Sequence, residues 1–344
     1  MDSIRVGVMT SPGNVEIAEV PKPQPGSGQM LIKIEACAIC TTEQRIYSGV
    51  QTWKRFPYVG GHEAAGIVEA IGPDAETDLR VGDHVAIFSS TCGHCHNCRR
   101  GHTNKCLHRE GFWEHAGLWG TWGLADYKVV KPRGLQFIHP DVSFEHGSLA
   151  EPLSCAVHGA RRSGVGIADD VVIVGAGTMG LLNAMVFKAT GALVTVLDLQ
   201  ESRCRKALEA GADHAFVPDE GTRDRIWDLT DGRGPDLVVV ASSSQAAYEL
   251  GQAMLAPFSR LLAFAGVYPP RETPIDMTQV HRSETHLFGT VSSDIEDILV
   301  AGKIISREMI DLGRVIECIM PFEQLSEAMD RALQPDSYRV VLRM

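Results

Sequence analysis

A glycine-rich turn between an apolar run and a helical stretch restricts the fold of this chain more than any other part of its sequence. The turn reads Gly175-Ala-Gly177-Thr-Met-Gly180 and directly follows Val171–Val174. A GxGxxG pattern is informative in this context, where a buried strand is followed by a helix. Gly175 permits a tight turn, Gly177 lets a pyrophosphate approach the backbone, and Gly180 lets the helix pack on the strand. The sequence therefore predicts a βαβ unit that binds a dinucleotide.

Strand-like and helix-like segments continue to alternate after this turn. We expect strands at Leu193–Leu197, Leu237–Val240 and Leu261–Phe264, and a helix at Gln245–Ala256. Such alternation is typical of a parallel sheet with helical crossovers. The second part of the chain is thus predicted to be an α/β domain.

Several residues around the glycine turn are candidates for holding the dinucleotide. Thr178 and Met179 lie at the start of the helix, whose amides can donate to phosphate groups. Asp198 ends the next strand, where a carboxylate suits the ribose hydroxyls of NAD and repels the additional phosphate of NADP. Arg203 lies close enough to oppose this preference, and the plainer alternative is that Asp198 only caps the next helix. NAD is expected as the cofactor, with NADP as the alternative.

The first part of the chain has a different character. Short β-like runs such as Met30–Ile34 are separated by turns rich in proline and glycine, which predicts a β-rich first domain. A chain of 344 residues with 44% apolar composition can bury two cores, so two domains are expected. The final segments are expected to form two helices and a strand, from Ile295, at Gln324–Ala332 and at Tyr338–Leu342.

Four cysteines gather in one short loop, with the spacing Cys92-x2-Cys95-x2-Cys98-x7-Cys106. Four thiolates complete the tetrahedral shell of zinc and leave no open position, so the loop predicts a structural zinc site. An iron–sulfur cluster also takes four cysteines, and plain reduced thiols are the third alternative. Zinc is favoured because nothing else in the sequence indicates electron transfer.

Composition excludes several classes of partner. The formal net charge is −11 and no lysine- and arginine-rich run is present, so nucleic acid is not an expected partner. No apolar stretch approaches the roughly 20 residues needed to span a bilayer, and the N-terminus lacks a secretory pattern. We therefore expect a cytoplasmic protein without a membrane partner. Clustered cysteines in a reducing compartment more often bind metal than form disulfides.

Three separated segments carry further candidate metal ligands. They are Cys40, His62 within a Gly-His-Glu sequence, and Glu151 before a proline. Taken alone, each has a more ordinary explanation: a lone cysteine is usually a small core residue, a lone histidine a structural one, and a glutamate before proline a turn residue. Composition and spacing do not join the three.

The order of these segments resembles the zinc-dependent medium-chain dehydrogenases. The resemblance rests on Cys40, on Gly61-His62-Glu63, on the four-cysteine loop, on Glu151-Pro152 and on the glycine turn, and it spans essentially the whole chain. Within that family the chain is similar to the polyol and threonine dehydrogenase branch, because Glu151 stands where liver-type alcohol dehydrogenases have a cysteine.

The resemblance implies the domain organisation. It implies a GroES-like catalytic domain at residues 1–152, to which residues 290–344 return, and a Rossmann domain with a doubly wound parallel sheet at residues 153–289. It also implies a homodimer or homotetramer, with subunits joined at the edge of the Rossmann sheet near His286–Gly289.

The resemblance further implies a second, catalytic zinc. Its implied ligands are Cys40 and His62, with a carboxylate, Glu63 or Glu151, that coordinates the metal or holds its water. Thr42 matches the family hydroxyl that passes the substrate proton onward, although a bond to its own backbone is the simpler alternative. The implied activity is hydride transfer between NAD and the carbinol or carbonyl carbon of a small hydroxylated substrate, such as a secondary alcohol, a polyol, a sugar or an amino alcohol.

Two positions depart from the family pattern. Glu43 stands where family members usually have an aspartate, and Arg45 stands where they usually have a histidine. A guanidinium does not release a proton near neutral pH, so Arg45 cannot end a proton relay as an imidazole would. Water or the ribose hydroxyl is expected to end it instead.

An aromatic segment, Gly111–Gly123, holds three of the five tryptophans. It is expected either to wall the substrate cleft, with Glu114 and His115 as polar contacts, or to pack beneath the loop. Ile46 stands where polyol-acting relatives often have an aromatic residue, so a sorbitol-like specificity is not transferred. The sequence leaves the alcohol and the direction of the reaction open.

Two alternative functions stand beside the main prediction. A zinc-free reductase of the same fold, acting on quinones or activated double bonds, is disfavoured by Cys40, His62 and the Glu-Pro segment. A non-catalytic NAD-binding protein is disfavoured by the same ligands and by Thr42, whereas Arg45 favours it.

Overall fold

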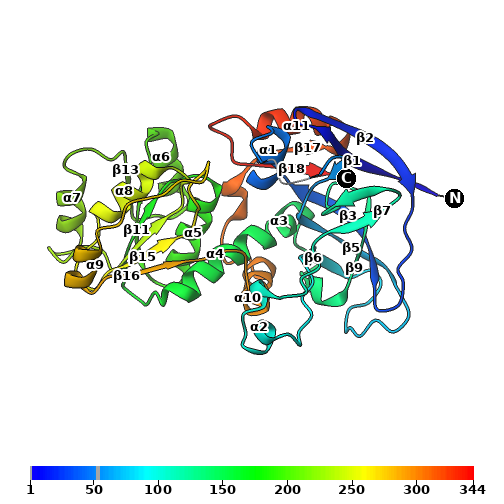
Figure 1. Cartoon of the computed structure of the whole chain (residues 1–344), viewed down its shortest axis with the longest axis horizontal. Helices are drawn as coiled ribbons and strands as arrows, with labels where there is room; N and C mark the ends of the chain where they lie inside the picture. The colour runs from blue at the N-terminus through cyan, green and yellow to red at the C-terminus, as the bar shows by residue number, and fades with distance from the viewer. Residues whose placement is uncertain (1, 52–54) are drawn as a thin grey trace. The chain divides into compact units, whose positions relative to one another are not determined.

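A computed structural model describes residues 2–51 and 55–344. The chain divides into two compact units, each of which has its own sheets and core (Figure 1). The first unit comprises Met1–Ser154, Ser293–Glu308 and Val315–Met344, and the second comprises Cys155–Ser292 and Met309–Arg314.

These bounds differ from the expected domain limits in two respects. The crossings fall after Ser154 and after Ser292, two and three residues beyond the expected ones, and the first lies inside helix α4 (Ala150–Ser163). Met309–Arg314 belongs to the second unit, although it was expected in the returning segment. One contact that holds it there is an ion pair of 3.8 Å between Arg314 and Glu209, which no sequence spacing indicates.

The second unit contains a six-stranded sheet in which every neighbouring pair is parallel. The strand order is β13-β12-β11-β14-β15-β16, so the chain starts in the middle, builds one half and then the other. This is the doubly wound order that the family resemblance implied, and its parallel pairing is the one that the alternating segments predicted. The strands are β11 (Asp170–Val174), β12 (Leu193–Leu197), β13 (His214–Phe216), β14 (Leu237–Val240), β15 (Arg260–Ala263) and β16 (His286–Gly289).

Helices connect these strands, as parallel pairing requires. Buried side chains of the strands, such as Val172, Val238 and Leu261, form a core with the helices. Ser244 caps one helix by accepting a hydrogen bond from the amide of Ala247 at 3.1 Å. The helices within this unit are α5 (Thr178–Ala189), α6 (Glu201–Glu209), α7 (Thr222–Leu229), α8 (Gln245–Ala253) and α9 (Met277–Ser283).

The first unit contains two largely antiparallel sheets. One has the order β2-β1-β4-β8-β7, and the other has the order β10-β6-β5-β3-β18-β17 with β9 also paired to β3. The strands are β1 (Ser3–Ser11), β2 (Asn14–Pro21), β3 (Met30–Ala38), β4 (Tyr58–Val59), β5 (Glu63–Ile71), β6 (His84–Ile87), β7 (Trp113–His115), β8 (Leu118–Gly120), β9 (Tyr127–Val130), β10 (Leu135–Phe137), β17 (Ile316–Pro321) and β18 (Arg339–Arg343).

The C-terminal segment completes the first unit. Strand β18 pairs antiparallel with the end of β3, where Leu342 stands opposite Cys37. Phe322, Leu325 and Met329 join the main core of this unit, which also holds Ile46 and Tyr58. The α-helices of this unit other than α4 are α1 (Thr41–Tyr47), α2 (His96–Arg99), α3 (Phe144–Ser148), α10 (Ile295–Ser306) and α11 (Leu325–Ala332).

The expected elements agree with the observed ones to within about four residues. The largest differences are at the ends of elements: the first β-like run extends to Ala38, and the predicted helix from Gln245 ends at Ala253. Helix α10 starts at Ile295, where Asp294 and Asp297 form a capping box. Within residues 2–51 and 55–344, no helix has the length and apolar character required to cross a bilayer.

Substitution of Gly180, the last glycine of the turn, tests whether its missing side chain is needed for packing. A Cβ atom at Gly180 would stand 1.9 Å from the carbonyl oxygen of Gly175, whereas one at Gly177 would meet nothing closer than Arg203 Nη1 at 3.7 Å. Gly180→Ala should therefore lower the free energy of unfolding by roughly 1–3 kcal/mol. Gly177→Ala, the matched control, should change it by less than about 0.5 kcal/mol. Urea unfolding of both variants measures this, and equal stabilities would show that Gly180 has no packing role.

Candidate active site and metal centres

The structure brings together three side chains that the sequence places in separate segments. Ligand atoms of Cys40, His62 and Glu63 all lie within 4.8 Å of one another. Cys40 precedes helix α1 as its N-cap residue, and Glu63 opens strand β5 directly after His62. Thiolate, imidazole and carboxylate are the donors that zinc takes in proteins, so this group fits a zinc ion.

Glu43 fixes the orientation of His62. Its Oε1 atom lies 3.0 Å from His62 Nδ1 and accepts a hydrogen bond from the amide of Gly61 at 3.1 Å. Burial opposes ionisation of Glu43, but His62 and the Gly61 amide outweigh it and lower the pKa of this carboxyl. An ionised Glu43 accepts a hydrogen bond from the protonated Nδ1 atom of His62. The other ring nitrogen is then unprotonated and can bind a metal ion.

Arg339 balances the charge of Glu63. Its Nε and Nη2 atoms donate to the two carboxylate oxygens at 2.7 and 2.6 Å, and Nη2 also lies 3.7 Å from Cys40 Sγ. Both partners are buried, with 4% and 0% of their side chains exposed. A bidentate pair of this kind compensates much of the cost of burying two charges.

The protonation chemistry of the group also fits a cation. Burial raises the pKa of the Cys40 thiol, and the charge of Glu63 raises it further, while Arg339 and His62 act in the opposite direction. Metal ligation requires the thiolate, which a divalent cation stabilises. The residues present therefore fit zinc. A bound zinc ion would supply the positive charge that stabilises the Cys40 thiolate.

The other expected site residues of the first unit lie around this group. Thr42 Oγ1 is 3.8 Å from Cys40 Sγ. Glu151 is not one of the three clustered ligands, but its charge acts on both Glu63 and Arg339. Arg45 lies on α1, in the last turn. The structure thus brings Cys40, His62 and Glu63 together and leaves Glu151 outside the group.

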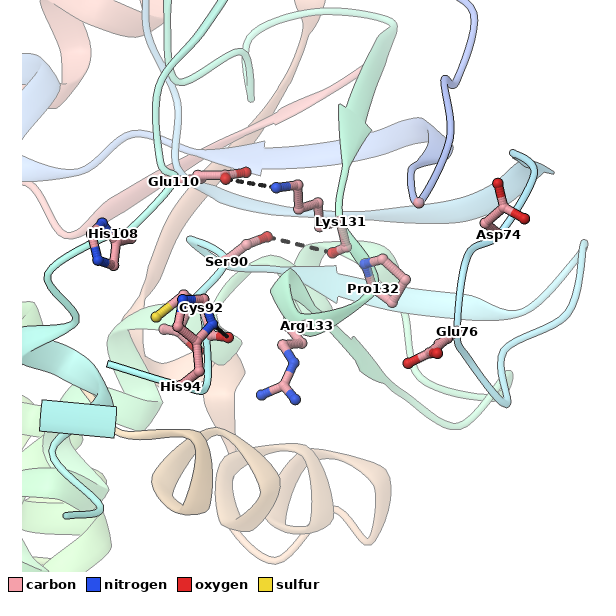
Figure 2. Close-up of a pocket in the computed structure, with 12 residues that line it drawn as sticks. Asp74, Glu76, Ser90, Cys92, His94, His108, Glu110, Lys131, Pro132 and Arg133 are labelled. Carbon is pink, nitrogen blue, oxygen red and sulfur yellow. Dashed lines mark hydrogen bonds and ion pairs between the residues drawn. The ribbon is translucent and has the colours of Figure 1, made fainter. Parts of the chain in front are cut away.

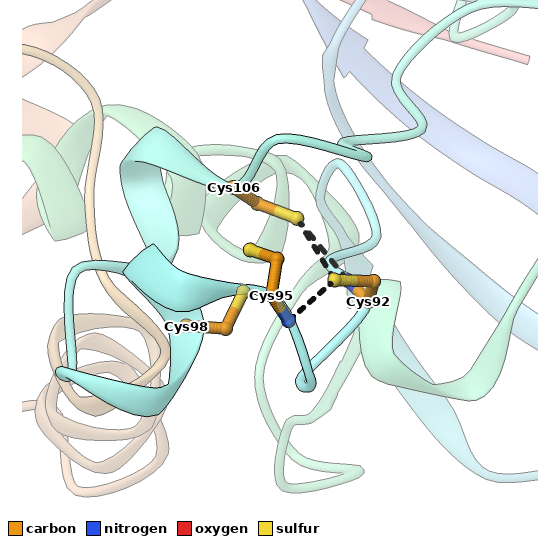
Figure 3. Close-up of side chains that lie close together, drawn as sticks. All are labelled: Cys92, Cys95, Cys98 and Cys106. Carbon is orange, nitrogen blue, oxygen red and sulfur yellow. Dashed lines mark hydrogen bonds between the residues drawn. The ribbon is translucent and has the colours of Figure 1, made fainter.

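The four cysteines of the loop form a second cluster, shown in Figure 3. Their sulfur atoms lie within 4.8 Å of one another, and those of Cys92 and Cys106 are 3.5 Å apart. The amides of Cys95 and His108 donate to sulfur atoms at 3.4 Å, which favours thiolates. Backbone hydrogen bonds lower the pKa of Cys95, whereas burial raises that of Cys98. The arrangement fits a tetrahedral zinc with no open position.

The loop at residues 92–106 that carries the four cysteines, here called the zinc lobe, is joined to the C-terminal part of the first unit. Thr103 and the amide of Asn104 both donate to Asp294 Oδ1, at 3.1 and 2.9 Å. The amide of Ile295 in turn donates to Thr103 Oγ1 at 2.9 Å. The zinc lobe and the start of α10 therefore stabilise each other, which gives the second cluster a structural role.

A surface pocket of about 400 Å³ adjoins the zinc lobe (Figure 2). Charged side chains of both signs line it, and Lys131 and Glu110 form an ion pair of 2.6 Å at one side. Arg133 lies against Gly93 of the cysteine loop. The lining includes Cys92 but none of the residues in or next to the Cys40 group, so this pocket is separate from the candidate active site.

The second unit assembles the expected dinucleotide residues. Gly175 has a φ of +104°, which only glycine adopts readily, and no side chain caps the start of α5 at Gly177. Asp198 Oδ2 accepts from the amide of Ala176 at 2.8 Å, and Oδ1 accepts from the amide of Gln200 at 2.9 Å. Arg203 Nη1 lies 3.9 Å from Asp198 Oδ2. Both residues therefore stand beside the turn, as expected of residues that contact the cofactor.

The aromatic segment is partly buried in the core and partly exposed, and its expected place in the wall of a substrate cleft stays a prediction. Trp122 is fully buried and its ring contacts that of Trp113 at 4.8 Å, so these two residues pack in the core. Phe112 and Trp119 instead stack on each other at 4.8 Å, and Phe112 is 46% exposed. His115 Nε2 donates a hydrogen bond to the carbonyl of Pro21 at 2.8 Å, so His115 connects strand β7 to the end of strand β2.

Sequence reasoning did not identify the roles of Glu43 and Arg339. Glu43 had a signal, because an acidic residue stands three positions after a candidate ligand. Arg339 also had one, since a cation inside the apolar run Tyr338–Leu342 is rarely buried without a partner. The identity of that partner depends on strand pairing far along the chain, which no local pattern indicates.

Comparison with known proteins defines the family. The family model of the alcohol dehydrogenase GroES-like domain matches residues 26–140, and that of the zinc-binding dehydrogenases matches residues 178–307. The chain is 34% identical to L-threonine 3-dehydrogenase of Pyrococcus horikoshii over 79% of each chain. It therefore belongs to the zinc-type medium-chain alcohol dehydrogenase family.

Two further similarities cover almost the whole chain. Sorbitol dehydrogenase of Bacillus subtilis is 28% identical over 96% of this chain and 94% of its own. The crystal structure of benzyl alcohol dehydrogenase from Acinetobacter calcoaceticus superposes with a TM-score of 0.91 at 21% identity and covers all of both chains. The last similarity concerns the fold alone. The protein is thus a zinc-dependent oxidoreductase that uses NAD or NADP, and the expected fold class and enzyme class are confirmed, whereas the preference for NAD over NADP stays a prediction.

Removal of the guanidinium from Arg339 tests the buried pair. In the zinc-free protein, Arg339→Met leaves the Glu63 carboxylate fully buried without a cation, so the free energy of unfolding should fall by about 3–5 kcal/mol. The double variant Glu63→Gln with Arg339→Met removes the unpaired charge and should recover most of this loss. Urea unfolding at neutral pH measures both, and a single variant as stable as the parent would contradict the role of the pair.

Proposed function

We propose that the chain is an NAD-preferring dehydrogenase of secondary alcohols that carry several hydroxyl groups, with its reaction centre at Cys40, His62 and Glu63. The convergence of these donors within 4.8 Å supports the proposal most directly. It favours this function over a zinc-free reductase, which needs no such group. Turnover of an alcohol with NAD separates it from a non-catalytic binding protein.

Each side chain at this centre has a separate proposed role. Cys40 and His62 would hold a zinc ion with Glu63 as the third donor, while Glu43 orients His62 and Arg339 balances the charge of Glu63. Zinc bound there would supply a Lewis acid that lowers the pKa of an alcohol. Glu151 stays outside this shell and orients water or substrate.

Thr42 is the proposed carrier of the substrate proton. Its hydroxyl both accepts and donates, and it lies 3.8 Å from the sulfur of a metal ligand. Arg45 cannot accept the proton afterwards, because a guanidinium is fully protonated near neutral pH. The proton therefore leaves Thr42 to water or to the ribose hydroxyl of the cofactor.

The preference for NAD rests on Asp198. Its side chain is held by two backbone amides beside the glycine turn and is 10% exposed. A carboxylate fixed there accepts from ribose hydroxyls and repels a 2′-phosphate. Arg203 weakens that repulsion only in part, because it is itself paired with Asp198.

The substrate class is inferred from relatives and from the composition of the site. The relatives named above act, by their names, on threonine and sorbitol, both of which carry a secondary hydroxyl group. The polar side chains proposed at this centre, Thr42 and Glu151, suit a hydroxylated substrate.

Assembly and location are proposed on two further observations. Strand β16 pairs with β15 and has no second neighbour among the described residues, so its outer edge is available to a second copy of the chain. All nine cysteines are free of disulfides, which is typical of a reducing compartment such as the cytoplasm. We propose a cytoplasmic homodimer or homotetramer.

The proposed ligands predict how zinc content changes with mutation. Cys40→Ser should reduce the zinc content from two ions to one per chain and abolish turnover, while the fold and NAD binding persist. Cys95→Ser, the matched control in the other cluster, should instead lower thermal stability. Elemental analysis, alcohol-dependent NADH formation and thermal unfolding measure these effects. Wild-type rates in Cys40→Ser would refute the ligand assignment.

The same measurements show whether Glu63 or Glu151 is the third zinc ligand. Glu63→Gln should lose the catalytic zinc, because Glu63 is the third donor in the cluster. Glu151→Gln should keep two zinc ions and still lose turnover. The reverse pattern would move the third ligand to Glu151 without changing the proposed reaction.

Cofactor preference is tested at one residue. Asp198→Ala removes the carboxylate that excludes the 2′-phosphate, so the ratio of kcat/KM for NAD over NADP should fall by roughly ten-fold or more. Arg205→Ala, which removes an exposed arginine on the following helix α6, serves as the control. An unchanged ratio in the Asp198 variant would remove the residue from the ribose site.

A further inference from the structure

A cationic side chain lies on the exposed aromatic stack of the first unit. The guanidinium carbon of Arg55 is 5.1 Å from the ring centroid of Trp119, and the Trp119 ring stacks on Phe112 at 4.8 Å. Arg55 Nη2 also pairs with Glu114 Oε2 at 2.7 Å. An arginine above an aromatic ring is held in place by the ring and still presents donors at its edge.

This stack is built next to His62. Strand β8 pairs with β4, and Trp119 stands opposite Tyr58 in that ladder, with ring centroids 5.7 Å apart. The chain then runs from β4 through two glycines to His62. A Cβ atom at Gly60, directly after β4, would stand 3.2 Å from Cγ of Glu43, the residue that contacts His62. The stack of Arg55 on Trp119 therefore adjoins the strand that leads to His62.

The partner of Arg55 is easily replaced. The side chains of Arg55 and Glu114 are 59% and 61% exposed, and an exposed ion pair contributes little to stability. A phosphate or carboxylate group offers the guanidinium two oxygen acceptors in the geometry that it binds best. An anionic ligand can therefore take the place of Glu114 at small cost, whereas a neutral alcohol has no comparable group to offer.

We propose that Arg55 is a specificity residue that binds an anionic group, a phosphate ester or a carboxylate, carried by the substrate away from its reacting carbon. Glu114 is the resident counter-ion that this group displaces, and Trp119 holds the guanidinium in position. The inference rests on the proposed function, because it extends the polyhydroxylated substrate by one charged end.

Matched pairs of substrates test the inference. We compare kcat/KM for sorbitol with sorbitol 6-phosphate and with gluconate, so that neutral, phosphate and carboxylate forms of one carbon skeleton are measured with NAD. The wild type should prefer an anionic form, and Arg55→Gln should reduce that preference roughly ten- to one-hundred-fold. Arg55→Lys should retain part of it, and Glu114→Gln should increase it. Arg80→Gln, which removes an exposed arginine elsewhere in the same unit, should leave the preference unchanged.

Direct binding separates failure of this inference from failure of the proposed function. Quenching of tryptophan fluorescence by sorbitol 6-phosphate or gluconate should saturate in the wild type and be lost in Arg55→Gln, whether or not turnover occurs. Equal use of neutral and anionic forms, with no change in Arg55→Gln, would overturn the role of Arg55 and leave the proposed dehydrogenase intact. Absence of turnover on all three compounds together with Arg55-dependent binding would refute the proposed reaction on these substrates and support the anion site.

Discussion

The buried ion pair between Arg339 and Glu63 is the interaction on which the candidate active site depends. It joins the last strand of the chain to the strand that follows His62, so residues almost three hundred positions apart are fixed at one point. Without the guanidinium, a carboxylate with no exposed surface would stand beside a thiol and an imidazole. Such a cluster is costly to bury unless each charge has a partner. The C-terminal return of the chain therefore serves the chemistry as well as the fold.

The charges around the centre are arranged in layers. Glu43 contacts the Nδ1 atom of His62, and Arg339 neutralises Glu63. The ligand atoms of Cys40, His62 and Glu63 lie within 4.8 Å of one another. Side chains that orient metal ligands in this way usually contribute to metal affinity as much as to structure. The cysteine cluster has a different design, because its thiolates are held by backbone amides and its lobe is tied to α10 through Asp294. One centre is thus suited to chemistry and the other to stability.

Local patterns predicted most of the fold. The strand that ends at Val174, the glycine turn after it and the alternating segments that follow predicted a parallel sheet with helical crossovers, because strand, turn and helix each have a short-range signature. The four-cysteine spacing predicted its own cluster for the same reason. Cys40, His62 and the carboxylates were joined only by resemblance to a family, since their proximity arises from pairing between distant strands. The partner of Arg339 and the stack of Arg55 on Trp119 could not be predicted, because a contact across a sheet leaves no mark on neighbouring positions. The assignment of Met309–Arg314 to the second unit escaped prediction on similar grounds.

Zinc X-ray absorption spectroscopy of the purified protein tests the central claim most directly. Two ions per chain, one with four sulfur ligands and one with a single sulfur beside nitrogen and oxygen, should give an average of about 2.5 sulfurs per zinc, at about 2.3 Å, together with a shell of lighter atoms near 2.0–2.1 Å. A spectrum with four sulfurs per zinc, no lighter shell and one ion per chain would mean that Cys40, His62 and Glu63 hold no metal, and the proposed hydride transfer would have no centre.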